Sequence, residues 1–152
     1  MAYVPDPSTF TDAAKLRKII ANAERLGQTD LALACRLRIA ELAGQKFDDV
    51  LEREFWMAVT CAEEFKTQEN GRTTILSRTR QKHKRVGALQ CLVDWAEDPK
   101  VTEGFHILLK AKRPDMTGEA IVLRHAEKFP PETVALARQK LEAHGVDVAS
   151  LH

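Results

Sequence analysis

The sequence lacks any apolar run that approaches the roughly 18 residues needed to cross a membrane. Its first residues also lack the basic and apolar blocks of a secretory signal peptide, because they contain the acidic Asp6 and the prolines Pro5 and Pro7. We therefore expect a cytoplasmic protein that has no contact with a membrane.

Cysteine and histidine are few and irregularly spaced. Cys35, Cys61 and Cys91 are odd in number and lie among apolar residues, which indicates reduced core thiols rather than disulfides. The histidines show no H-x-x-x-H spacing and the cysteines no C-x-x-C spacing, so we expect no zinc site. The sequence also has no P-loop, dinucleotide fingerprint or glycine-rich nucleophile elbow. We expect no cofactor and favour a non-enzymatic protein.

What is present is the composition of an ordinary globular protein, with 44% hydrophobic and 30% charged residues in a chain of 152. Apolar residues recur at helical spacing through most of the chain, which predicts an all-α protein: a compact bundle of six to seven helices. We expect a single helical domain over residues 1–152. Within it, residues 1–47 form an N-terminal αα-hairpin around Gly27-Gln28, and residues 48–152 form the core.

The longest predicted helix runs from about Asp48 to Glu69 and should be the central core helix. Its apolar stripe consists of Leu51, Phe55, Ala58, Val59, Ala62 and Phe65. A later apolar run, from Ala120 to Leu123, is too short for periodicity to separate helix from strand. No second strand candidate could pair with it, so we expect it to be helical as well.

The most polarised stretch of the chain is basic. Between Glu69 and Asp94 there is no acidic residue. Six of the 23 Lys and Arg residues lie in this stretch, so the rest of the chain carries 17 cations against 22 acidic residues. The six are Arg72, Arg78, Arg80, Lys82, Lys84 and Arg85. Because the net charge of the whole chain is only +1, any binding of a polyanion must come from this patch.

We predict that the basic stretch forms a helix over about residues 73–86. Thr73, Thr74 and Ser77 are possible N-caps, and Gly87 lies where a left-handed C-cap is expected. Helical spacing of 100° per residue predicts a narrow apolar seam of Ile75, Leu76, Thr79, His83 and Val86. It also predicts that Arg78, Lys82 and Arg85 form one flank, and Arg80 and Lys84 the other. A shorter, buried helix should follow from Ala88 to about Glu97.

A cationic helix of this kind indicates nucleic-acid binding, because closely spaced Arg and Lys suit a phosphate backbone. The expected class is a bacterial-type DNA-binding or DNA-associated accessory protein with double-stranded DNA as partner. Arg78, Lys82 and Arg85 would contact phosphates, and Arg80 and Lys84 the other flank or a base edge. Arg72, Thr73 and Thr74 would contact the backbone at the helix N-terminus. An arginine is the expected base reader, through guanine. A basic helix, a glycine and a buried helix outline a helix-turn-helix, although there the reading helix usually comes second.

Two alternatives remain open at this stage. In the first, the basic helix is neutralised by carboxylates of the acidic helix before it, such as Glu52, Glu63 and Glu64. The protein is then a helical adaptor for a protein partner or a second copy, and Trp56 and Met57, which lie off the apolar stripe, form its contact. In the second, it is a metal-dependent nuclease.

The nuclease alternative rests on Glu64 and Lys66, an E-x-K pair with Asp48 and Asp49 upstream. This pattern resembles the metal site of restriction-type nucleases, in which the two residues share the face of a strand. On a helix, residues two apart diverge by about 200°, so the predicted helix disfavours such a site. A nucleophile next to His83, either Ser77 or Cys91, is disfavoured too, since no oxyanion-hole loop accompanies it.

Overall fold

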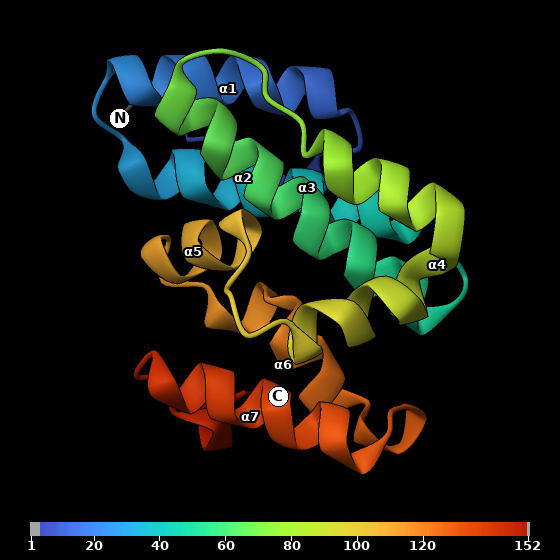
Figure 1. The fold of residues 1–152 in the computed structure, drawn as a ribbon. Coiled ribbons are helices and arrows are strands. Elements are labelled where there is room, and N and C mark those ends of the chain that lie inside the picture. The colour runs from blue at the N-terminus through green and yellow to red at the C-terminus, as the bar shows by residue number, and fades with distance from the viewer. Residues whose placement is uncertain (1–3, 152) are drawn as a thin grey trace.

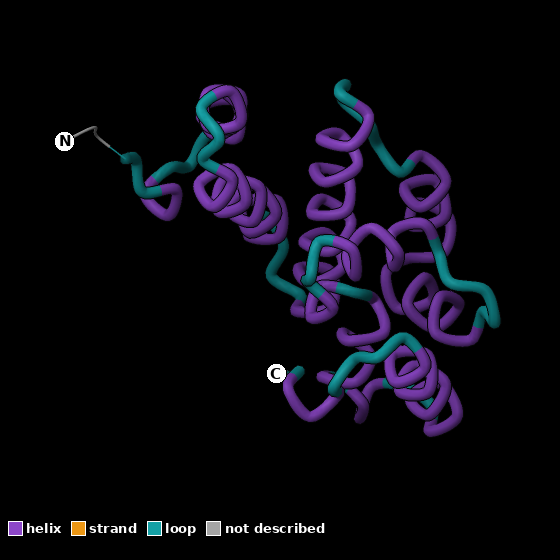
Figure 2. The backbone as a smooth tube through the Cα atoms, turned by 90° about the vertical axis from the view of Figure 1, so that its left-hand side faces the viewer, coloured by secondary structure: helices purple, strands orange, loops and turns teal. Residues whose placement is uncertain are grey.

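A computed structural model describes residues 4–151 of the chain (Figure 1). Within this range the chain forms seven α-helices and four short 3-10 helices and no strand, which confirms the predicted all-α bundle (Figure 2). The α-helices are α1 (Ala13–Arg25), α2 (Thr29–Gln45), α3 (Val50–Asn70), α4 (Ser77–Glu97), α5 (Glu103–Lys110), α6 (Gly118–Arg124) and α7 (Pro131–Ala143). The 3-10 helices are η1 (Pro7–Thr9), η2 (Pro114–Met116), η3 (Ala126–Lys128) and η4 (Val148–Ser150). None of the helices in residues 4–151 is long and apolar enough to span a membrane.

The N-terminal αα-hairpin is present as predicted. Asp12 begins α1, where its carboxylate accepts a hydrogen bond from the backbone N–H of Ala14. Gly27, with a φ of 72°, lies in the turn to α2. The two helices pack through a cluster of buried side chains: Leu16, Ile20, Ala23, Ala32, Cys35 and Ile39.

Helix α3 lies in the middle of the molecule, between the hairpin and α4 (Figure 2). Asp49 caps its first turn by accepting a hydrogen bond from the N–H of Glu52, and Gly71 ends it in a left-handed conformation. Five of the six residues of the predicted stripe are buried: Leu51, Phe55, Ala58, Val59 and Ala62. α3 is therefore the central core helix, as expected.

The second half of α4 and helices α5 to α7 build the C-terminal side of the bundle (Figure 1). Ala120 to Leu123 lie within α6, so the choice of helix for this short run is confirmed. Leu92, Ile121 and Ala137 join Phe55 in the main core. Glu119 is buried here beside Lys140, whose Nζ lies 3.2 Å from its Oε2, and burial raises the pKa of this carboxyl.

Helix α4 consists of two helical halves that meet at Gly87. Gly87 has a φ of 85° and a ψ of 172°, a conformation that side chains with a Cβ rarely adopt. The break predicted at this glycine is therefore present. The second half buries Ala88, Cys91, Leu92 and Ala96 in the core, as expected for the short helix after the glycine. The first half, Ser77 to Val86, carries most of the basic stretch.

Candidate nucleic-acid interface

The basic helix begins later than the sequence suggested. Its first residue is Ser77 rather than 73, its N-cap is Leu76, and no side chain caps it. The reason is that the segment before it is held in a loop: Thr74 N–H donates to Thr67 Oγ1 at 2.9 Å, and Thr74 Oγ1 donates to the carbonyl of Arg72 at 2.9 Å. Arg72, Thr73 and Thr74 thus lie in the connection from α3, just before the helix, and their contact with a nucleic-acid backbone stays a prediction.

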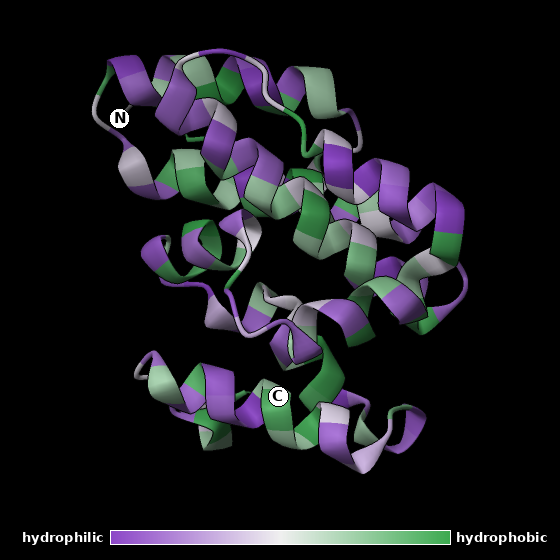
Figure 3. Ribbon diagram, viewed as in Figure 1, coloured by the Kyte–Doolittle hydropathy of each residue, from purple (hydrophilic) through white to green (hydrophobic). Residues whose placement is uncertain are grey.

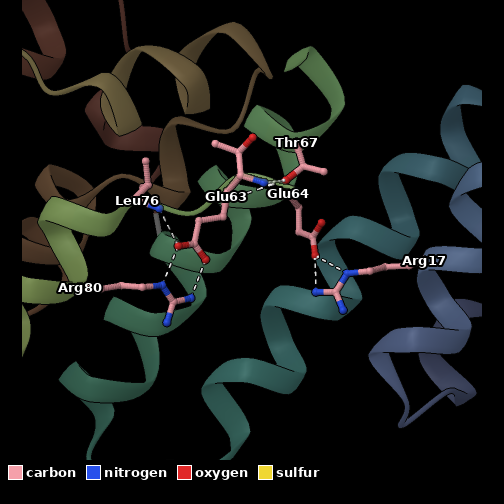
Figure 4. A network of polar contacts seen from close by, with 7 residues as sticks. Arg17, Glu63, Glu64, Thr67, Leu76 and Arg80 are labelled. Carbon is pink, nitrogen blue, oxygen red and sulfur yellow. Dashed lines mark hydrogen bonds and ion pairs between the residues drawn. The ribbon is translucent and has the colours of Figure 1, made fainter. Parts of the chain in front are cut away.

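Arg80 attaches the basic helix to α3. Its Nε donates to Glu63 Oε2 at 2.7 Å and its Nη2 to Glu63 Oε1 at 2.6 Å, so the pair is bidentate (Figure 4). The same carboxylate accepts the backbone N–H of Leu76 at 2.8 Å. Glu63 is 6% exposed, and hydrogen bonding to it raises the pKa of Arg80 above its usual value. Arg80 therefore holds the helix to α3, and its contact with a nucleic acid stays a prediction.

The neighbouring carboxylate, Glu64, points to the opposite side of α3, toward the hairpin (Figure 4). Arg17 on α1 donates to its Oε1 through Nε at 3.1 Å and through Nη2 at 2.8 Å. A cleft of about 890 Å³ lies around these two pairs, between α1, α3 and the connection that carries Arg72. Three of its four carboxylates, Glu24, Glu63 and Glu64, are bonded to arginines, so it offers no concentrated charge of one sign.

His83 and Lys82 are also engaged within the protein. His83 Nε2 lies 2.9 Å from Glu52 Oε2, and its ring stacks on that of Phe55 with the centroids 4.9 Å apart. Lys82 Nζ lies 2.6 Å from Asp94 Oδ2, in an ion pair that links the two halves of α4 across Gly87. This ion pair lowers the pKa of Asp94 through its hydrogen bond with Lys82.

The apolar seam that the helical spacing predicted is present in part, since Leu76 packs against the core and the His83 ring stacks on Phe55. Ile75 is 54% exposed and Val86 is 42% exposed, so neither anchors the helix. Charged and aromatic contacts with Glu52, Glu63 and Trp56 of α3 hold the rest of the helix.

Trp56 and Met57 both make contacts inside the protein. The Trp56 ring stacks on Phe47, meets Phe55 edge-on, and lies 5.1 Å from the guanidinium carbon of Arg80. Its Nε1 donates to Glu52 Oε2 at 3.1 Å. Met57 lies against Gly44 where α2 approaches α3. A partner contact at these two residues stays a prediction, and their intramolecular packing already accounts for their apolar character.

Within the basic stretch, the cations without an ion-pair partner in residues 4–151 are Arg72, Arg78, Lys84 and Arg85. The last three are exposed on the first half of α4, where they share one face with Ser77 and Gln81. The N-terminal half of α4 is accordingly mostly hydrophilic (Figure 3). This set differs from the predicted flanks, since Lys82 and Arg80 leave it. The uncharged Ser77 and Gln81 share the exposed face with the remaining cations, a position that helical spacing of 100° per residue already indicates.

The geometry supports neither the metal-dependent nuclease nor a nucleophile beside His83. Glu64 and Lys66 lie on helix α3, where Glu64 binds Arg17 and Lys66 binds Glu103. Among the residues that the structure describes, no three His, Cys, Asp or Glu side chains gather as metal ligands. Cys91 is fully buried, and burial raises the pKa of its thiol, which disfavours the thiolate that a nucleophile requires.

The sequence matches no protein-family model, and no curated protein and no solved structure is significantly similar to it.

Proposed function

We propose that this protein binds double-stranded DNA through the exposed face of the first half of α4. A single observation carries the proposal: Arg78, Lys84 and Arg85 share one exposed face and have no carboxylate partner within residues 4–151. Their neighbours Arg80 and Lys82 do have such partners. The fold thus separates cations that hold the helix from cations that face solvent.

The separation supports a polyanionic ligand on electrostatic grounds. Cations on one exposed helix face repel one another when no counter-charge is near. Phosphates relieve this repulsion, and each neutralised phosphate releases condensed counterions. Arginine adds a planar guanidinium that pairs with phosphate through two hydrogen bonds. Counterion release and the pairing of arginine with phosphate do not depend on the base sequence of the DNA. We therefore expect the protein to bind duplexes of any sequence.

Salt dependence of binding tests the proposal. Three phosphate contacts predict a slope of log K against log salt of about −2.7, so the dissociation constant rises roughly 40-fold between about 50 mM and about 200 mM salt. We expect this from fluorescence anisotropy with a labelled duplex of mixed sequence. The variant Arg78→Gln/Lys84→Gln/Arg85→Gln should lose most of the affinity and most of the slope, with its helical content unchanged by circular dichroism.

A charge-matched variant controls for net charge. Lys15, Lys18 and Arg25 are exposed on α1, which lies on the other side of α3 from α4, and they too have no ion-pair partner in the described range. Lys15→Gln/Lys18→Gln/Arg25→Gln changes the charge of the chain by the same amount and should bind DNA like the native protein. Equal losses in both variants would contradict a site on α4. No binding by the native protein would reject the proposal and turn attention to an acidic protein partner.

A further inference from the structure

Gln81 occupies the middle of the exposed face of α4. At 100° per residue, Arg78 and Arg85 lie about 60° and about 40° to one side of it, and Lys84 and Ser77 lie about 60° and about 40° to the other. The face therefore has an uncharged amide at its centre and a cation on each flank.

The Gln81 side chain is exposed and makes no hydrogen bond in the described part of the protein. Gln90, in the second half of the same helix, instead donates to Asp94 Oδ1 at 2.8 Å. The Gln81 amide, which can both donate and accept hydrogen bonds, is thus free to bind a ligand at the most outward position of the helix.

Given the DNA binding proposed above, we infer that Gln81 reads a base edge in the major groove while the flanking cations contact the phosphates on either side. The straight part of α4, from Ser77 to Val86, is about 15 Å long, and the major groove is about 12 Å wide and admits an α-helix. A helix in the groove turns its central residues to the bases and its flanks to the two backbones. A glutamine amide matches adenine, accepting from N6 and donating to N7.

The face of α4 opposite Gln81 supports this role because its side chains attach the helix to the rest of the protein. Arg80, Lys82 and His83 each contact a carboxylate, at distances of 2.6 to 2.9 Å. These contacts come from two elements, α3 and the second half of α4, so the first half is restrained along its length. A restrained helix fixes the position of Gln81 before DNA arrives, and base discrimination depends on such preorganisation.

Selection of binding sites from random duplexes tests this inference. The native protein should enrich a short motif that contains an adenine preferred by roughly 5- to 150-fold over other bases, the range for one bidentate contact. Gln81→Ala should lose the preference at that position alone, with its salt slope on mixed-sequence DNA unchanged. Gln139→Ala, which replaces an exposed glutamine on α7, is the matched control and should select the native motif.

The outcomes separate this inference from the proposed function. Salt-dependent binding by the native protein together with no motif, or with a motif that Gln81→Ala leaves intact, would overturn base reading by Gln81 and leave DNA binding standing. Absence of binding to any duplex would reject both. A motif that Gln139→Ala changes as much as Gln81→Ala does would show an effect of glutamine loss in general and would also overturn the assignment.

Discussion

Replacing Arg80 by alanine should destabilise the protein far more than replacing its exposed neighbour Arg78. Arg80 supplies two of the three hydrogen bonds that Glu63 accepts, and Glu63 is 6% exposed. Arg80→Ala would leave that carboxylate buried with only the N–H of Leu76 as a donor. Arg78 has no ion-pair partner among the described residues, so its loss removes no such contact.

The magnitude follows from the burial of the two partners. Removing one partner of a buried ion pair costs about 3 to 5 kcal/mol. The Arg80 side chain is 40% exposed, so water entering the vacated space solvates Glu63 in part and reduces this cost. The contact between the Arg80 guanidinium and the Trp56 ring is lost as well, at about 0.5 to 1 kcal/mol. We expect a net loss of about 2 to 3 kcal/mol in the free energy of unfolding.

Urea and thermal unfolding measure this loss. For a chain of this size a change of 1 kcal/mol shifts Tm by about 2 to 4 °C, so Arg80→Ala should lower Tm by about 4 to 12 °C. Arg78→Ala should stay within about 0.5 kcal/mol of the native protein. Equal stabilities of the two variants would refute the reasoning. So would a double-mutant cycle with Glu63→Gln that shows no coupling, since residues in one network should couple by about 0.5 to 3 kcal/mol.

Two further predictions concern packing and pH. Gly118→Ala should destabilise the protein by about 1 to 3 kcal/mol in thermal unfolding, because a Cβ at this position would lie 2.5 Å from Cε3 of Trp95. Gly104→Ala is the control for this variant. Its Cβ would have no neighbour closer than 3.8 Å, so it should be neutral in the same assay. The ion pair with Lys82 lowers the pKa of Asp94 below its usual 3.8, so its contribution to stability is present above that value and disappears as the pH falls below it. Asp94→Asn should therefore cost about 0.2 to 1 kcal/mol in urea unfolding at pH 7 and almost nothing near pH 2, and an equal cost at both would contradict this assignment.

Much of the helical organisation could be predicted because it depends on local chemistry. The apolar stripe of α3 and the proline at the start of α7 act within a few residues of where they lie. Gly87 interrupts α4 for a similarly local reason, since its φ of 85° suits glycine alone. The start of the basic helix was missed because Thr74 bonds to Thr67, seven residues earlier and on another element.

The sequence by itself determined that the protein is all-helical, that its cations concentrate in one segment, and that this segment ends at Gly87. Only the tertiary structure decided which of those cations face solvent. Arg80 and Arg78 are two residues apart and carry the same charge, but Glu63, 17 residues before Arg80, reaches only one of them. The choice depends on how α3 and α4 pack, because an ion pair forms within about 4 Å, and helical periodicity alone does not set the distance between two helices.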